Sequence, residues 1–171
     1  MRLTTRTIVI VVSLIVALDQ LTKYWIDSSM KLYQSDGIIP GIFALTYVRN
    51  TGAAFGFLSE MPDGFRQPFF YLTTGIAIII LAGFLRRLGE TEQLARLSVV
   101  GILSGAIGNL IDRIRFGYVI DFLDFSWQGY HWPAFNVADT CITLGVIGLL
   151  CSSVWGDRAQ TQLQSPAQPP G

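Results

Sequence analysis

Residues 105–139 read GAIGNLIDRIRFGYVIDFLDFSWQGYHWPAFNVAD, and this stretch joins two strongly apolar segments of the chain. Its polar residues include two asparagines and four aspartates: Asn109, Asn136, Asp112, Asp121, Asp124 and Asp139. An ionised side chain near hydrocarbon is costly unless it is paired, so intramembrane acids are rare and usually functional. This many polar groups at the junction of two apolar segments therefore indicates a functional site.

The composition favours a membrane protein. Of the 171 residues, 51% are hydrophobic and 14% are charged, which is more apolar and less charged than an ordinary soluble domain. The formal net charge is zero. The sequence therefore predicts no basic surface for a nucleic acid.

Four apolar segments approach the length of about 20 residues that crosses a bilayer as a helix. The first resembles a secretory signal peptide, but it has no small-residue cleavage site and continues into Tyr24 and Trp25, which are typical of a membrane interface. We therefore predict that it is retained. The third carries glycines that favour close helix packing, Gly101, Gly105 and Gly108. The predicted spans are residues 7–26, 68–88, 94–113 and 136–155.

The segments between the spans have a different pattern. Residues 27–67 are punctuated by glycine and proline, and Phe43, Leu45 and Tyr47 alternate with other residues, which predicts a small sheet or hairpin. The Gly/Ala/Phe run at 53–57 could form a platform for an extended apolar ligand. An ordinary extracytoplasmic loop fits the same pattern.

Four spans place both termini on one side of the membrane and residues 27–67 and 114–135 on the other. Lysines and arginines are divided evenly between the two sides, so their count does not fix the orientation. Arg86 and Arg87, at a tight connection, favour cytoplasmic termini. We predict one four-helix transmembrane domain over residues 1–156. Residues 157–171 are polar and rich in Pro and Gln, which predicts a disordered cytoplasmic tail.

Two groups of polar residues lie near span ends. Asp19 and Lys23 are one helical turn apart, so they can form an ion pair that either ends the helix or supports a site. Asn109 and Arg113 lie one turn apart on the glycine-lined face of the third span, which favours a role in a site. Asp112 is interpreted as an interfacial anchor paired with Arg113.

Asp121 and Asp124 are alternative candidates for one acidic site residue. Residues 118–122 are strand-like, and side chains alternate between the two faces of a strand. Asp121 and Asp124 therefore point in opposite directions, and at most one of them faces the helices. The apolar neighbours of Asp121 indicate partial burial, but this pattern alone leaves the choice open.

Asp139 has two interpretations. Asn136 can cap the fourth span while Asp139, three residues later, returns a hydrogen bond to it, which is the reciprocal capping arrangement. That role alone could explain both residues. An acid at a helix N-terminus is also held ionised by the helix dipole, which suits one member of a catalytic carboxylate pair. The two interpretations can hold together.

Two carboxylates that share a site keep one proton between them near neutral pH. The ionised group can then take a proton from water while the neutral group hydrogen-bonds the carbonyl under attack. Asp121 and Asp139, if they meet at the membrane surface, could hydrolyse a peptide bond in this way. The single histidine, His131, lies in a Trp/Tyr-rich loop, and no zinc or P-loop pattern occurs. We expect no metal and no cofactor.

At these residues the sequence closely resembles the lipoprotein signal peptidases (signal peptidase II), a family of four-helix bacterial membrane aspartyl proteases. The match covers nearly the whole chain before residue 157, in five ordered blocks. These are DQLTK at 19–23, NTGAAF at 50–55, GAIGNLIDR at 105–113, VIDF at 119–122 and FNVAD at 135–139.

The resemblance implies an endopeptidase that removes the signal peptide from diacylglyceryl-modified prolipoproteins, just before the lipidated cysteine. It implies that Asp121, not Asp124, pairs with Asp139 as the catalytic dyad. It also implies a bacterial inner-membrane location, cytoplasmic termini, an extracytoplasmic active site and inhibition by the cyclic peptide globomycin. We expect membrane lipids as partners, and a monomer. The residues implied to line or support the substrate site are Asp19, Lys23, Asn50, Gly52, Gly105, Asn109, Arg113, Asn136 and Ala138.

Two other functions compete with this one. An ion- or proton-coupled transporter predicts acids near the bilayer midplane and inverted repeats, whereas the acids here lie at span ends and no repeat is visible. A non-enzymatic assembly factor would use Asp/Arg pairs to dock partner helices. Separate Asp121→Asn and Asp139→Asn variants distinguish a protease from a docking protein.

Overall fold

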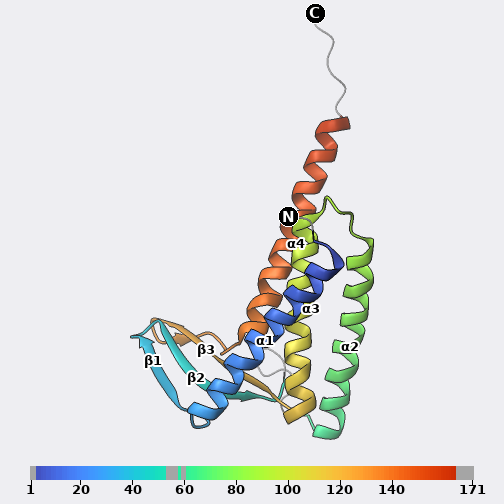
Figure 1. The fold of residues 1–171 in the computed structure, drawn as a ribbon. Coiled ribbons are helices and arrows are strands. Elements are labelled where there is room, and N and C mark those ends of the chain that lie inside the picture. The colour runs from blue at the N-terminus through green and yellow to red at the C-terminus, as the bar shows by residue number, and fades with distance from the viewer. Residues whose placement is uncertain (1–2, 53–57, 59–60, 165–171) are drawn as a thin grey trace, which may run out of the picture.

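The computed structural model describes residues 3–52, 58 and 61–164, with side chains described as far as residue 154. Figure 1 shows the long helices side by side, with a small sheet at one end of the bundle and the start of the first helix and the end of the last helix towards the other. The helices are α1 (Thr5–Ser29), α2 (Asp63–Arg87), α3 (Gln93–Phe116) and α4 (Val137–Gln164). The strands are β1 (Ser35–Ile39), β2 (Phe43–Asn50), β3 (Val119–Trp127) and β4 (Tyr130–His131).

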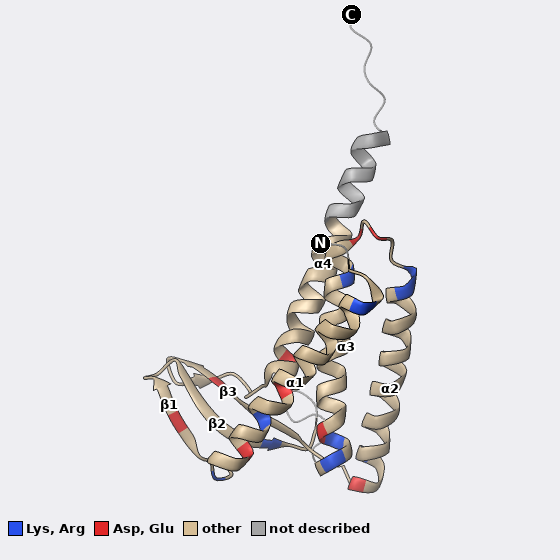
Figure 2. Ribbon diagram, in the orientation of Figure 1, with Lys and Arg blue, Asp and Glu red and all other residues tan. Residues whose placement is uncertain are grey.

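All four helices are long and apolar enough to cross a membrane. Figure 2 shows the long middle part of α2 without charge. Its charged residues are Asp63 and Arg66 near the start of the helix and Arg86 and Arg87 at its end. The predicted class, a membrane α-helical protein with four transmembrane helices and a small sheet, is confirmed. The lipid-facing helices keep apolar side chains on their surface because hydrocarbon, not water, is their solvent.

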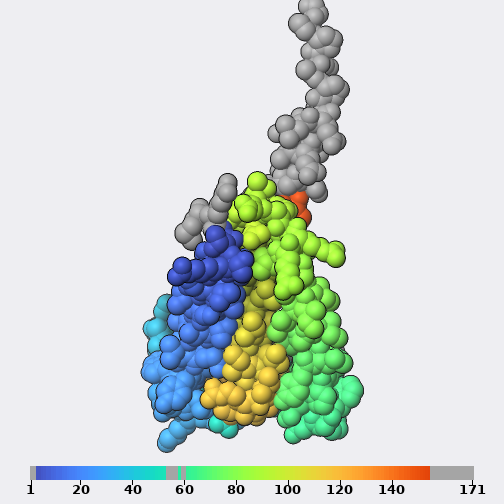
Figure 3. All heavy atoms as spheres, turned by 45° about the vertical axis from the view of Figure 1, so that its right-hand side comes forward, coloured from blue at the N-terminus to red at the C-terminus, as the bar shows by residue number. Residues whose placement is uncertain are grey.

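α3 is the central helix of the bundle. It contacts the other three helices, and Figure 3 shows it between α1 and α2. In the most apolar 18-residue stretch of α3, half of the residues are buried, whereas 6–11% are buried in the corresponding stretches of the other three helices. The glycine stripe makes this possible: Gly101 and Gly105 lie against the backbone of α4, and Gly108 lies against Asp19 of α1. The predicted close packing along this stripe is confirmed.

The helix ends differ from the predicted spans by several residues. α2 begins at Asp63, five residues before 68, because Pro62 precedes it and an acid in the first turn suits the helix dipole. Pro68 is tolerated within the helix. α3 extends to Phe116 and stops at Gly117, whose φ of 78° is the left-handed conformation that commonly ends helices.

α4 is longer than predicted. It runs to Gln164, nine residues beyond the predicted end of the fourth span at residue 155. Residues 157–164 contain no proline, and the first one after the span is Pro166, so no residue in this segment blocks the helix. Residues 165–171, the rest of the predicted tail, lie outside the described part of the chain.

The sheet has the order β1-β2-β3-β4, and each neighbouring pair is antiparallel. Val48 of β2 pairs with Asp121 of β3. One face of these strands packs on the end of α1 through a cluster formed by Ile26, Tyr47, Ile120 and Phe122. The strand predicted from the alternation of Phe43, Leu45 and Tyr47 is β2. The apolar platform predicted at 53–57 lies outside the described residues.

Candidate active site

Asp121 lies on the face of β3 that is turned away from α1. Its neighbours Ile120 and Phe122 belong to the core cluster on α1, so strand alternation points Asp121 to the opposite face. Its side chain is 2% exposed. The carboxylate accepts hydrogen bonds from Asn50 Nδ2 at 2.9 Å and Asn136 Nδ2 at 2.7 Å.

The environment of Asp121 favours its protonated form. Burial, and then the charge of Asp139, raise the pKa of Asp121 from its ordinary value of 3.8 to about 7, against the opposing effects of Asn50, Asn136 and Lys23. At neutral pH Asp121 is therefore partly protonated.

Asp139 lies in the first turn of α4. Its backbone N–H donates to Asn136 Oδ1 at 2.9 Å, and the Asn136 N–H donates to Asp139 Oδ2 at 3.3 Å. The predicted reciprocal cap is confirmed. Asp139 also accepts a hydrogen bond from Asn109 Nδ2 at 2.8 Å, so the cap does not use all of its acceptor capacity. The cap is therefore compatible with a further role for this carboxylate.

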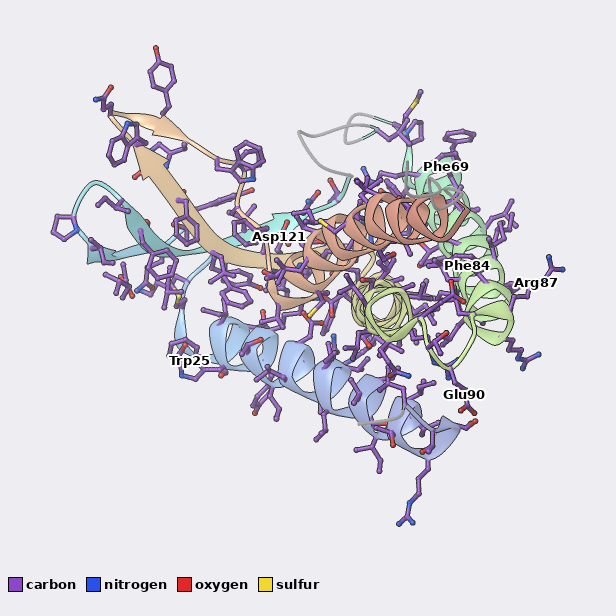
Figure 4. All side chains as sticks on the ribbon, turned by 90° about the horizontal axis from the view of Figure 1, so that it is seen from above. Trp25, Phe69, Phe84, Arg87, Glu90 and Asp121 are labelled. Atoms are coloured by element: carbon purple, nitrogen blue, oxygen red, sulfur yellow. The ribbon has the colours of Figure 1, made fainter. Side chains whose placement is uncertain are left out.

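Asp121 and Asp139 line the same cavity, which has a volume of about 990 Å³. Its walls come from residues 48–51 at the end of β2, from α3, from residues 132–135 and from residues 139–144 of α4. Figure 4 shows Asp121 where the sheet meets the helices. Within the described ranges, no cluster of His, Cys, Asp and Glu is suited to hold a metal ion. The ionisable groups in the cavity are suited to proton transfer to and from a bound substrate.

Asp124 has different partners from Asp121. It accepts hydrogen bonds from Thr46 Oγ1 at 3.0 Å and lies 3.0 Å from His131 Nδ1. Asp121 lines the cavity beside α3 and α4, and Asp124 is not among the residues that line it.

Arg113 also lines the cavity and interacts electrostatically with both Asp121 and Asp139. Its Nη2 donates to the Gly52 carbonyl at 3.1 Å, and its guanidinium lies 4.5 Å from the centre of the Phe70 ring. These contacts tie α3 to the segment that follows β2 and to α2. They hold a positive charge near the two acids without a direct ion pair to either.

A buried charged cluster lies behind the cavity. Lys23 Nζ lies 2.9 Å from Asp19 Oδ2, 3.0 Å from Asp112 Oδ2 and 2.9 Å from Asn109 Oδ1. The predicted Asp19–Lys23 pair is therefore formed, and it does not simply end the helix. Because Lys23 also contacts Asn109, which contacts Asp139, the cluster is connected to the site by hydrogen bonds.

The interpretation of Asp112 as an interfacial anchor is wrong. Its side chain is 1% exposed, and its partners are Lys23 and Gln20 of α1 and the backbone of β3, not lipid headgroups. A buried acid needs such partners because desolvation is costly. One signal in the sequence could have found it: Asp112 is three residues after Asn109, on the same side of a helix.

The remaining predicted site residues shape the cavity from behind. Gly105 packs closely against Ala138 and Ile142 of α4. A Cβ added at position 105 would lie 2.7 Å from Ile142 Cγ1. Ala138 is fully buried and Asn136 is also 0% exposed. Gly52 receives the hydrogen bond from Arg113. Of the predicted residues, Asn50, Asn109, Arg113, Asp121 and Asp139 reach the cavity wall.

Four helices of membrane-spanning length and one cavity lined by two carboxylates, one buried and one half-buried, are features of a multi-pass membrane protein with a site of the aspartic-protease kind. The comparisons agree with this class. Residues 11–155 match the family described as signal peptidase (SPase) II, and the chain belongs to that family. The resemblance predicted from the five sequence blocks is confirmed.

Individual relatives and structures point the same way. The lipoprotein signal peptidase of Syntrophotalea carbinolica is 48% identical over 92% of this chain and 96% of its own length. That of Geobacter metallireducens is 47% identical over 91% and 94%. A solved structure described as a bacterial membrane enzyme has a TM-score of 0.83 and 31% identity, and covers 99% of this chain and 98% of its own.

Proposed function

We propose that this protein is a membrane aspartic endopeptidase that removes the signal peptide from diacylglyceryl-modified prolipoproteins, just before the lipidated cysteine. Family membership supports the reaction, and the placement of Asp121 and Asp139 in one cavity supports the catalytic pair. Both acids lie at one end of the bundle, on a strand and in the first turn of α4. A transporter would instead need acids spread across the bilayer.

In the proposed reaction, the ionised carboxylate of the pair takes a proton from a water molecule, and the resulting hydroxide attacks the scissile carbonyl carbon. The protonated carboxyl donates a hydrogen bond to the carbonyl oxygen and stabilises the negative charge that develops there. The C–N bond then breaks as the amine takes a proton from the pair. No covalent intermediate is needed, so a nucleophilic side chain is not required.

The cavity suits an extended peptide next to lipid. Ile142 and Leu144 of α4 supply an apolar wall on the side of the bundle, while Arg49 and Asn50 of β2 supply a polar wall on the side of the sheet. A signal peptide would lie along α4 in the bilayer, with its cleavage site beside β2. Asn50, Asn109 and Arg113 are the proposed substrate-contacting residues. Gly52, Gly105, Asn136, Ala138, Asp19 and Lys23 are proposed to support them.

The proposed location is the bacterial inner membrane, with cytoplasmic termini and an extracytoplasmic active site. The start of α1 and the end of α4 lie at the end of the bundle opposite the sheet (Figure 1). Arg96 donates there to the backbone of Leu3 and Leu88, and Arg86 and Arg87 end α2 at the same connection. Clustered arginines at a short connection favour the cytoplasmic side. We also propose a monomer in contact with membrane lipids, inhibited by globomycin.

The test uses purified full-length protein and a diacylglyceryl-modified precursor, with the unlipidated precursor as a substrate control. The wild type is expected to cleave only the lipidated form, and globomycin is expected to prevent this. Asp121→Asn and Asp139→Asn should each abolish cleavage in a folded protein. Asp124→Asn, on the same strand as Asp121 but with other partners, is the matched control and should cleave normally. Intact precursor with folded wild type would overturn the proposal.

A further inference from the structure

The backbone next to Asp121 is held by side chains from two helices. The Ile120 N–H donates to Asp112 Oδ2 of α3 at 3.1 Å, and the Ile120 carbonyl accepts from Asn136 Nδ2 at 3.3 Å. Ile120 is the residue that immediately precedes Asp121 in β3. Asp112 therefore fixes the backbone position from which the Asp121 side chain reaches the cavity.

The backbone next to Asp139 is held in the same way. The Ala138 N–H donates to Asp19 Oδ1 of α1 at 2.9 Å, and Ala138 immediately precedes Asp139 in α4. Each acid of the pair thus follows a residue whose N–H is bound by a second, buried aspartate. Asp19 is fully buried and Asp112 is 1% exposed.

One lysine joins the two holding aspartates. The Lys23 ammonium has three N–H donors, and three acceptors surround it: Asp19 Oδ2, Asp112 Oδ2 and Asn109 Oδ1. Because an ammonium cannot accept a hydrogen bond, it fixes the Asn109 oxygen towards itself and the Asn109 NH₂ towards Asp139. Lys23 therefore sets the distance between Asp19 and Asp112. It also sets the orientation of the Asn109 amide, which contacts Asp139.

We propose that the Asp19–Lys23–Asp112 triad is a positioning device that sets the separation of the Asp121 and Asp139 carboxyl groups, with Asp112 as the residue that places Asp121. The inference rests on the proposed catalytic roles of those two acids. None of the three triad residues lines the cavity, so they act through the Ile120 and Ala138 backbones and through Asn109. A buried ion-pair triad does not by itself indicate a stabilising role, since apolar replacements are often as stable. Its proposed role is to fix the positions of Asp121 and Asp139, which is separate from stability.

Asp112 is the position at which the proposal is tested. Asp112→Ala removes the acceptor for the Ile120 N–H, and misplacement of a reacting group by about 1 Å lowers turnover roughly 10²-fold. We expect a loss of this size in kcat with KM little changed, because the substrate contacts remain. Asp112→Asn keeps an oxygen for the Ile120 N–H but loses the charge, so its loss of kcat should be smaller.

The pH profile separates positioning from a merely structural role. Without the Asp112 charge, Lys23 is less neutralised, and its positive charge favours the ionised form of Asp121. The alkaline limb of kcat against pH should therefore move to lower pH in Asp112→Asn. Asp124→Asn also removes one negative charge, but from β3, where Asp124 contacts Thr46 and His131. This variant should leave kcat and its pH profile unchanged. The charged groups around the pair are Asp19, Lys23, Arg49, Asp112 and Arg113.

The experiment measures kcat, KM and the pH profile on the folded fraction of each variant. A merely structural role would lower the folded yield and leave the kcat of folded protein at the wild-type value, which would overturn the proposal. If Asp112→Ala does not fold, Asp112→Asn decides: wild-type kcat and an unmoved profile would overturn it. If the folded wild type does not cleave the precursor, the proposed function is overturned as well. If the wild type is active and the Asp112 variants have its kcat and pH profile, only this inference is overturned.

Discussion

Asn136 donates its side-chain amide to the Asp121 carboxylate at 2.7 Å, while its side-chain oxygen accepts the Asp139 N–H at 2.9 Å. One asparagine therefore contacts both acids of the proposed pair. The hydrogen bonds that begin α4 and those that place Asp121 share this residue, so the start of the helix and the geometry of the site are not independent.

Asn136→Ala is expected to lose both stability and turnover. Loss of a side-chain helix cap costs about 0.5–2 kcal/mol, and Asp121 loses its shorter hydrogen-bond donor. Thermal unfolding and kcat on the folded fraction measure the two effects. Thr4→Ala is the matched control, since Thr4 caps α1 by accepting from the Thr7 N–H, far along the chain from the pair. Equal kcat in the two variants would contradict a role for Asn136 in the site.

The stability of the protein is expected to fall as pH rises from about 4 to 7. The folded pKa of Asp121 is about 7, against an ordinary value of 3.8, so in this window the folded state binds a proton that the unfolded state has lost. Stability decreases with pH wherever the folded state binds more protons. Asp121→Asn removes the titrating group and should flatten this part of the curve. Thermal unfolding midpoints in detergent across this range measure it, and parallel curves for the two proteins would refute the assignment.

Gly105→Ala is expected to disrupt the packing of α3 on α4. The added Cβ would collide with the Ala138 carbonyl and lie 2.7 Å from Ile142 Cγ1, and a backbone atom cannot move aside at low cost. Because Ala138 immediately precedes Asp139, both the unfolding midpoint and cleavage activity should fall. Gly75→Ala in α2 meets nothing within 4 Å and should leave both unchanged. A Gly105→Ala protein that matched Gly75→Ala would contradict this packing argument.

Local patterns were sufficient for much of the fold. The apolar segments predicted four helices, the alternation at 43–47 predicted β2, and the spacing of Asn136 and Asp139 predicted the cap. Each of these depends on neighbours within a few residues. The length of α4 was underestimated, because polar composition indicates disorder without excluding a helix.

The role of Asp112 could not be derived from local patterns. Its partners are Lys23 and Gln20, about 90 residues earlier, and a backbone N–H on a strand that returns after α3. A side chain at a span end is equally compatible with lipid headgroups until those elements are placed together. The choice of Asp121 over Asp124 likewise needed either the resemblance or the sheet's orientation on α1.

The pairing of Asp19 with Lys23 one turn apart on α1 has a consequence for biogenesis. α1 carries both charges of this pair, so its cost of entering lipid is lower than that of either charge alone. Asp112 of α3 takes its ion-pair partner from another helix, Lys23 of α1, so this pair can form only where the two helices meet. This acid, whose ion-pair partner lies on another helix, is thus carried by the helix that the finished bundle buries most.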